Sequence, residues 1–415
     1  MAIISKLEAK EILDSRGNPT VQASCRLQDG TIEIASVPSG VSTGKYEAFE
    51  LRDNDMNRYR GKGVERAVGN INGEISEFLV GKELDQNTLD EALINLDGTK
   101  NKQRLGANAI LAVSLAFARA SAKEKGIPLF KYLANIYFKN ENERMYKIPQ
   151  PVFNTIEGGK HSDSGLSFQE FLLVPQEFEN IKIKLEVIKK IFISLKDLLV
   201  KDGYEVNLGD EGGFSPKLSS DEKVLEYFNM AISSAGYNAD QVKIGLDVAA
   251  TTFFKDGLYL IKENKLNTRE MIEMYKKLCE QYKIISIEDG LNEEDFAGFA
   301  EMNKALGQMI NIVGDDITVT NIDLIKNAIN NKSINTLLIK PNQIGTLSET
   351  MQAIRLAKEN NIKTFISHRG GETEDTFVAD LAVAVGADFI KAGGPTKPER
   401  IVKYHRLIEI EELIK

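Results

Sequence analysis

Short apolar runs that each end on a charged or ionisable residue recur through the C-terminal half of the chain. In one of them, Leu337-Leu338-Ile339 ends at Lys340, and Pro341 and Gly345 follow. Such a run is typical of a buried parallel strand that leads into a loop, although a surface lysine after a strand is the alternative for any single run. Comparable runs end at Asp247, Glu288, Asp315, His368 and Lys391. The pattern predicts a series of buried strands with charge at their final residues.

The spacing of these end residues predicts how the strands are arranged. Neighbouring end residues are 23 to 41 residues apart, which fits one strand, one helix and two loops, as in a β/α barrel. Barrel strands present their C-terminal ends at one mouth, and the chemistry of such folds takes place there. Three carboxylates, two lysines and the pair His368-Arg369 are therefore expected to meet at one site.

The N-terminal part of the chain has a different pattern. Residues 21–27 and 31–37 alternate between apolar and polar positions, and Asp29-Gly30 between them signals a hairpin turn. Helical periodicity follows over residues 64–79 and 105–122. A small antiparallel sheet followed by helices is therefore predicted.

These patterns predict two domains. The charged run 139–144 precedes a proline-containing stretch and is the predicted linker. The N-terminal α+β domain is expected to cover residues 1–140, and the barrel is expected to cover residues 141–415, with its first strand near Val152.

Composition and charge narrow the function classes. The 415 residues are 42% hydrophobic and 27% charged, as in an ordinary globular protein of two domains. The formal net charge of −9 gives no support to nucleic-acid binding, but it suits a site that gathers carboxylates around divalent metal. Cys25 and Cys279 have no metal-binding spacing and are predicted to be reduced thiols of a cytoplasmic protein.

No segment is predicted to enter or span a membrane. Residues 1–16 carry several charges and lack the apolar core of a signal peptide. The longest apolar stretch, residues 107–118, is too short to span a bilayer and is predicted to be a buried helix.

Three glycine-rich segments are candidates for a site. Segment 37–45 does not meet the phosphate-loop motif, because only three residues separate its last two glycines. It is either a plain surface loop or a lid that closes over a site. Segment 158–165 contains His161 and precedes a strand predicted over residues 167–174, which carries Gln169 and Glu170. The third segment, 207–214, sets Asp210 and Glu211 among glycines, which allow the backbone to approach a ligand closely.

These stretches resemble the enolase family along nearly the whole chain. The matching motifs include EILDSRGNPT (11–20), VPSGVSTGKYEAFELRD (37–53), SFQEFLLVP (167–175), NLGDEGGFSP (207–216), SIED (286–289), LLIKPNQIGT (337–346) and SHRGGETEDTF (367–377). The resemblance implies a modified eight-fold β/α barrel of the α/β class with a smaller N-terminal α+β domain, usually as a homodimer or a ring of dimers. It also implies a hydro-lyase of glycolysis and gluconeogenesis, which dehydrates 2-phosphoglycerate reversibly to phosphoenolpyruvate.

The resemblance also implies roles for particular residues. Two Mg²⁺ ions are expected, with Asp247, Glu288 and Asp315 as ligands and Ser39 reaching the second ion. Lys340 matches the base, which must be neutral, and nearby metal cations and a second lysine are expected to disfavour its charged form. Glu211 matches the acid, with Glu170 assisting. The expected substrate contacts are His161, Gln169, Glu288, Asp315, His368, Arg369, Gly370 and Lys391. Hard Mg²⁺ and oxygen ligands suit a reaction that adds negative charge to a carboxylate.

Two other functions stay open, one from a departure from the family at Gly370 and one from the C-terminal lysine. Gly370 stands where most members have serine next to the phosphate contact, which leaves open a related enzyme acting on another phospho- or phosphono-carboxylic acid. A binding protein is the other alternative. Lys415 ends the chain, and members with a C-terminal lysine are sometimes captured by plasminogen after secondary display on the cell surface.

Overall fold

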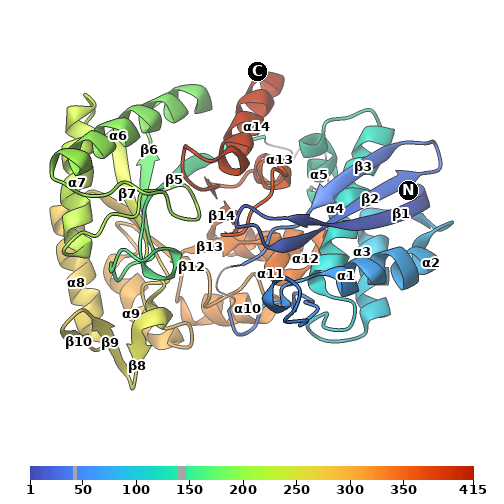
Figure 1. Cartoon of the computed structure of the whole chain (residues 1–415), viewed down its shortest axis with the longest axis horizontal. Coiled ribbons are helices and arrows are strands. Elements are labelled where there is room, and N and C mark those ends of the chain that lie inside the picture. Colours follow the sequence, from blue (N-terminus) through green and yellow to red (C-terminus); the bar gives the residue numbers. More distant parts are fainter. Residues whose placement is uncertain (41–43, 139, 141–145) are drawn as a thin grey trace.

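The computed structural model describes residues 1–40, 44–138, 140 and 146–415 (Figure 1). Residues 41–43 of the predicted loop and most of the predicted linker therefore lie outside the described residues. Figure 1 shows the N-terminal elements grouped on one side of a barrel formed by the rest of the chain.

The N-terminal sheet contains four antiparallel strands in the order β3-β2-β1-β4. Strands β2 (Pro19–Leu27) and β3 (Ile32–Ser36) confirm the predicted hairpin. Strands β1 (Ala2–Leu13) and β4 (Glu83–Leu84) were not predicted. Apolar and polar residues do not alternate regularly along β1, so its sequence lacks the usual signal of a strand. For example, the two buried residues Ile4 and Leu7 are three positions apart instead of two.

Helices cover one face of this sheet. The predicted segment 64–79 forms α1 (Glu65–Asn70), a π-helical turn (Ile71–Ile75) and α2 (Ser76–Leu79). The further helices are α3 (Gln86–Asp97), α4 (Ala107–Glu124) and α5 (Leu129–Tyr137). Helix α4 is buried almost all round, because it packs on β2 and β3 and also contacts α11 (Pro341–Ile344) and α12 (Leu347–Glu359) of the barrel.

The barrel is closed, and its strand order confirms the predicted fold class. The order around it is β11-β12-β13-β14-β15-β5-β6-β7. The strands are β5 (Gln150–Glu157), β6 (Glu170–Pro175), β7 (Val242–Asp247), β11 (Ile284–Glu288), β12 (Asn311–Gly314), β13 (Thr336–Ile339), β14 (Lys363–Ser367) and β15 (Phe389–Lys391).

Helices surround the barrel strands. They are α6 (Ile181–Lys201), α7 (Asp221–Ser234), α8 (Thr268–Gln281), α9 (Phe296–Leu306), α10 (Ile322–Asn331), α11 (Pro341–Ile344), α12 (Leu347–Glu359), α13 (Phe377–Ala384) and α14 (Pro398–Ile414). A small sheet of β8 (Phe254–Lys255), β9 (Leu258–Ile261) and β10 (Asn264–Leu266) precedes α8. None of the helices in the described ranges has the length and apolar character needed to cross a bilayer.

Strand β6 runs antiparallel to both of its neighbours, β5 and β7. It therefore brings its first residue, Glu170, to the mouth where the parallel strands end. In register, Glu170 pairs with Glu157 at the end of β5 and with Asp247 at the end of β7. The predicted strand began at residue 167, whereas β6 begins at Glu170.

The interior of the barrel is apolar below this mouth. A cluster of buried side chains fills it, made of Val152, Leu172, Val174, Val313, Leu338 and Phe365. Because the barrel axis is filled, charged side chains have room only at the strand ends.

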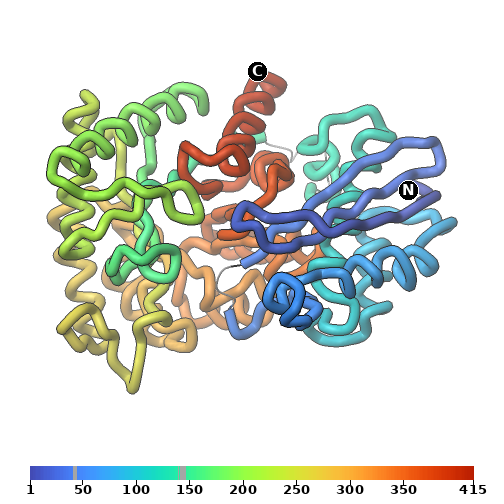
Figure 2. Tube along the Cα trace, in the orientation of Figure 1, coloured from blue at the N-terminus to red at the C-terminus, as the bar shows by residue number. Residues whose placement is uncertain are grey.

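The turn between β1 and β2 reaches the barrel mouth from the N-terminal sheet, as the tube in Figure 2 shows. The Ser15 backbone N–H donates to the Glu372 carbonyl at 2.7 Å, and the Ser39 N–H donates to the Gly371 carbonyl at 2.8 Å. The N-terminal unit therefore lies against the loop that follows β14.

Both cysteines are predicted to be inert in the folded protein. Cys25 is fully buried in β2 and Cys279 is partly buried in α8, and neither forms a disulfide. Burial raises the pKa of the Cys25 thiol to about 12 and that of Cys279 to about 11. The reactive thiolate is therefore scarce at pH 8 and increases as the pH approaches 11. We expect no labelling of either thiol by a disulfide reagent at pH 8, and full labelling in denaturant; rapid native labelling would contradict this.

Candidate active site

The barrel mouth holds a narrow cavity of about 30 Å³. Of the predicted site residues, all except Ser39 and Glu288 line it: His161, Gln169, Glu170, Glu211, Asp247, Asp315, Lys340, His368, Arg369, Gly370 and Lys391. Glu47, Ala249, Asp289, Asp316 and Ser367 complete the lining. The structure thus brings together side chains from almost every strand of the barrel.

The Lys391 ammonium lies among three buried carboxylates. Its Nζ atom is 2.9 Å from Glu288 Oε2, 3.0 Å from Glu170 Oε2 and 3.1 Å from Asp247 Oδ2. All four side chains are almost completely buried. Glu288 therefore belongs to the site through Lys391, although it does not line the cavity.

Lys340 forms a second ion pair on the neighbouring side of the mouth. Its Nζ donates to Asp315 Oδ2, and Gln343 Nε2 donates to Asp315 Oδ1 at 2.8 Å. Burial alone would lower the pKa of Lys340, but Asp315 outweighs burial, so that the pKa lies above its usual value. The expectation that Lys340 is neutral is therefore not met by the protein's own charges.

Asp289 fixes the backbone that carries Asp315. Its two carboxylate oxygens accept hydrogen bonds from the backbone N–H groups of Asp315 and Asp316, at 3.0 and 2.8 Å. Asp289 also has a φ of 43°, a left-handed conformation that costs energy for a residue with a side chain. Such local strain is common at functional sites.

The electrostatics of this half of the site suit a cation. Burial raises the pKa of Glu288 and Asp289 well above the usual range, with Asp247 and Asp316 as the respective next causes. Burial and Asp315 raise the pKa of Asp316 to about 7. The buried carboxyl groups therefore outnumber the two lysines that can neutralise them.

The donor set also fits a divalent metal. Carboxylate oxygens are the ligands that hard cations such as Mg²⁺ prefer. One group, Asp289, Asp315 and Asp316, has ligand atoms within 4.8 Å of one another. The predicted set of Asp247, Glu288 and Asp315 does not form one such group among the described residues. Lys391 contacts Asp247 and Glu288, and Lys340 contacts Asp315. A metal held by these three residues would therefore displace the lysines from them.

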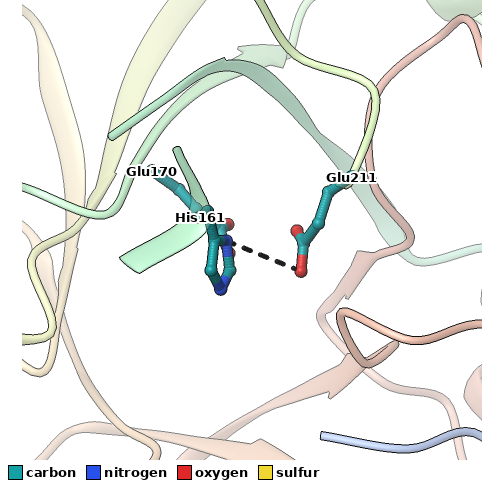
Figure 3. A group of neighbouring side chains, drawn as sticks. All are labelled: His161, Glu170 and Glu211. Atoms are coloured by element: carbon teal, nitrogen blue, oxygen red, sulfur yellow. Dashed lines mark ion pairs between the residues drawn. The ribbon is translucent and has the colours of Figure 1, made fainter. Parts of the chain in front are cut away.

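The other half of the site contains His161, Glu170 and Glu211 (Figure 3). His161 Nδ1 lies 3.4 Å from Glu170 Oε1 and 3.8 Å from Glu211 Oε1. His368 Nε2 lies 3.3 Å from Glu211 Oε2, and Asn154 donates to the same oxygen at 3.1 Å. Two buried carboxyl groups and two imidazoles therefore form a proton-handling cluster.

Within this cluster the two carboxyl groups differ. Burial, and then the neighbouring Glu211, raise the pKa of Glu170 well above the usual range. Burial also opposes the charge on Glu211, but His368, His161 and Arg400 favour it, and the pKa of Glu211 lies well below the usual range. Burial lowers the pKa of His368 to about 4, so that it faces Glu211 as a neutral N–H donor at pH 7. Of the two carboxyl groups, Glu170 therefore carries the proton and Glu211 is ionised.

Arg369 is engaged by the N-terminal unit. Its guanidinium donates to Glu47 at 2.9 and 3.2 Å and to Asn342 Oδ1 at 3.1 Å. The Gly370 carbonyl accepts a hydrogen bond from Arg400 at 2.7 Å. A phosphate bound by Arg369 would therefore take the place that Glu47 holds.

Ser39 does not line the cavity. Its hydroxyl donates to Glu50 at 3.1 Å and accepts from Arg52 at 2.7 Å. Its role as a metal ligand stays a prediction, and residues 41–43 next to it lie outside the described residues.

Several residues of the site were not predicted. Asp289 and Asp316 directly follow predicted ligands, and these acidic doublets at strand ends were a usable signal. Glu47 and Arg400 had no such signal, because their contacts join segments far apart in the sequence.

A barrel that gathers buried carboxylates, lysines and an arginine at its strand ends is typical of a metal-dependent enzyme that acts on an anionic substrate. Comparison with known proteins agrees. Residues 4–133 match the family described as enolase, N-terminal domain, and residues 145–415 match enolase, C-terminal TIM barrel domain. The chain is also 46% identical over 413 residues to the enolase of Ehrlichia ruminantium (strain Gardel), covering 99% of this chain and 96% of that protein.

This chain belongs to the enolase family. Membership confirms the predicted resemblance, the fold class and the enzyme class, a hydro-lyase of the phosphopyruvate hydratase type. The family is metal-dependent, which agrees with the acidic groups of the cavity.

We expect Lys391→Met to destabilise the protein, because it removes the buried ammonium that Asp247, Glu288 and Glu170 surround and leaves the acidic cluster without its counter-ion. Loss of one partner from such a buried cluster costs about 3–5 kcal/mol. Thermal unfolding in chelator should show a clearly lowered Tm, and millimolar Mg²⁺ should restore part of it by binding the same carboxylates. Lys223→Met, which removes a half-exposed ion pair with Glu226, is the matched control. An unchanged Tm for Lys391→Met in chelator would contradict the charge balance described here.

Proposed function

We propose that this chain dehydrates 2-phosphoglycerate reversibly to phosphoenolpyruvate, with Lys340 as base and Glu211, assisted by Glu170, as acid. The observation that carries this assignment is the position of β13 and β6. Lys340 follows β13 and Glu170 begins β6, and these strands lie opposite each other in the order around the barrel. A base and an acid placed in this way reach opposite faces of a substrate held between them.

We infer that Mg²⁺ is the cofactor, with two ions per active site. Asp247, Glu288 and Asp315 would hold one ion, and Ser39 would reach the second. When bound, the ions neutralise the negative charge that develops on the substrate carboxylate as its α-proton leaves. The excess of buried carboxyl groups over cations supports this inference.

Lys340 accepts the α-proton of the substrate. It must be neutral to do so, whereas Asp315 stabilises its charged form. Asp315 and Glu288 raise the pKa of Lys340, and once both are engaged as metal ligands, burial, Arg369 and Lys391 remain, which all lower it. Asp315 would therefore keep Lys340 protonated when no metal is bound. When Asp315 binds the metal, Lys340 would lose this partner and could become neutral.

The proton of the Glu170 and Glu211 pair leaves with the hydroxyl group of the substrate. The departing hydroxide takes this proton and leaves as one water. Lys340 then gives the α-proton to solvent, and the carboxyl pair regains a proton from solvent, which restores the enzyme for the next turnover. His161 and His368 contact this pair and keep it in place. Gln169 lines the cavity beside it.

Arg369 is the proposed phosphate ligand, because its planar fork matches two phosphate oxygens. Substrate binding would exchange Glu47 for phosphate on the same guanidinium. Lys391, which is released from Asp247 and Glu288 when they hold the metal, would provide positive charge for the substrate. Gly370 offers no side chain next to Arg369, and this favours the second candidate, a family member that acts on a related phospho- or phosphono-carboxylic acid.

Other predictions stay proposals. We infer a division into residues 1–140 and 141–415, which is supported by the separate sheet and barrel. A homodimer or ring of dimers and a cytoplasmic location follow from the family resemblance. Lys415 is exposed after α14, as capture by plasminogen at a cell surface would require.

The base and acid roles are tested by separating proton exchange from dehydration. Lys340→Ala should stop exchange of the α-proton of 2-phosphoglycerate with solvent, because it removes the amine proposed to accept that proton. Glu211→Gln should spare the exchange and slow phosphoenolpyruvate formation by about 10²–10⁴-fold. Exchange is followed by NMR in deuterated water, and dehydration by ultraviolet absorbance. If Glu211→Gln stopped exchange while Lys340→Ala left it running, the roles would be reversed.

Gly370→Ser distinguishes the two candidate substrates. A hydroxyl hydrogen-bonded to a charged phosphate contributes roughly 1.5–3 kcal/mol. For a phosphopyruvate hydratase, we expect kcat/KM on 2-phosphoglycerate to stay unchanged or to rise. A poor wild-type enzyme that improves markedly in the serine variant would indicate another substrate. An efficient wild-type enzyme whose serine variant loses activity would contradict both candidates.

A further inference from the structure

Glu157 is a buried acidic residue outside the set of predicted site residues. It is the last residue of β5, has no exposed surface and does not line the cavity. In the β5–β6 register it pairs with Glu170. Its backbone is fixed as well, because its N–H donates to the Phe214 carbonyl at 2.8 Å.

The Glu157 carboxylate binds the loop that carries Glu211. Its Oε1 atom accepts from the Glu211 N–H at 3.0 Å and from the Gly213 N–H at 2.7 Å. Its Oε2 atom lies 3.2 Å from the same Glu211 nitrogen. A Cβ atom on Gly209 would lie only 2.2 Å from Oε2, so the loop closes around this carboxylate without room for a side chain.

The segment between β15 and α14 holds the opposite side of this loop. Lys397 Nζ donates to the Asp210 carbonyl at 3.0 Å, the Gly394 N–H donates to the Glu211 carbonyl at 2.8 Å, and Thr396 donates to the Gly212 carbonyl at 2.8 Å. The carbonyl groups of the loop are thus bound from one side and two of its N–H groups from the other. Among the described residues, Glu157 is the one side chain recorded on the N–H side.

The position of Glu157 is electrostatically unfavourable. Burial, and then the neighbouring Glu211, raise its pKa to about 8, while the two backbone N–H groups act in the opposite direction. An acidic group beside another acid does not improve packing, and an apolar side chain would avoid this cost. The hydrogen bonds to the Glu211 loop therefore offset this cost and are the role that we assign to the Glu157 carboxyl group.

We propose that Glu157 is a positioning residue for the dehydration step, which holds Glu211 at a fixed separation from Glu170. The proposal rests on the acid role proposed for Glu211. Glu157 and Glu170 are register partners on β5 and β6, so the same strand pair supports both carboxyl groups of the acid. Lys340 lies on the opposite side of the barrel, and proton abstraction therefore does not depend on this contact.

Three variants test this role. Glu157→Ala removes both acceptor oxygens, and Glu157→Asp withdraws the carboxylate by one methylene. Glu157→Gln retains one oxygen that can accept from both N–H groups. Asp90→Ala is the matched control, because Asp90 is a fully buried carboxylate that accepts from the Ser348 backbone N–H, remote from the cavity. Each variant is assayed with Mg²⁺ and 2-phosphoglycerate for α-proton exchange and for phosphoenolpyruvate formation, and its Tm is recorded.

For Glu157→Ala we expect dehydration to fall about 10²-fold, since a displacement of roughly 1 Å has that effect on a catalytic group. Exchange should stay within about threefold of the wild type. Glu157→Gln should retain more dehydration than Glu157→Asp, and Asp90→Ala should keep the wild-type ratio of dehydration to exchange. If Glu157→Ala does not fold, the proposal is tested by whether Glu157→Gln retains more dehydration activity than Glu157→Asp.

A ratio of dehydration to exchange that stays at the wild-type value in both Glu157→Ala and Glu157→Asp would overturn the proposal. So would a Gln variant that is no better than the Asp variant. Failure of the proposed function looks different: Glu211→Gln itself would then dehydrate 2-phosphoglycerate normally, or the wild type would not turn it over.

Discussion

The compensation of buried carboxylates by two lysines is the interaction on which the barrel mouth depends. A carboxylate buried without a partner is very costly, and this site buries several within a few ångströms of one another. Lys391 compensates Glu170, Asp247 and Glu288, and Lys340 compensates Asp315. The same carboxylates are the expected metal ligands, so the lysines and the metal compete for one set of oxygens. That competition links metal binding to the protonation of the base.

The reversed strand β6 explains how one barrel places an acid opposite a base. If β6 were parallel to its neighbours, Glu170 would lie at the far end of the barrel. Because β6 is antiparallel, Glu170 meets Glu157 and Asp247 at the mouth, and the loop with Glu211 closes over it. The N-terminal unit completes the site through Glu47, which holds Arg369. Fold topology and long-range contacts therefore contribute as much to the site as the strand ends do.

Much of this arrangement could be predicted from the sequence. Parallel strands buried on both faces give continuous apolar runs, and a charge at the end of such a run indicates the mouth, which is why Asp247, Lys340 and Lys391 were found. The direction of β6 could not be predicted, because an apolar strand has the same pattern in either direction. Contacts such as that between Glu47 and Arg369, which are 322 residues apart, leave no local signal. Ser39 was predicted as a metal ligand from the resemblance alone, and its bonds to Glu50 and Arg52 do not bear on that role.

The central claim is that a divalent cation and the two lysines share the carboxylates of the mouth. The most direct measurement is a crystal structure with Mn²⁺, which binds oxygen ligands as Mg²⁺ does and is located by its anomalous scattering. The account predicts an anomalous peak among Asp247, Glu288 and Asp315, with the Lys340 ammonium moved away from Asp315. A peak only beside His161, Glu170 and Glu211, or Lys340 still bound to Asp315 with the metal in place, would contradict it.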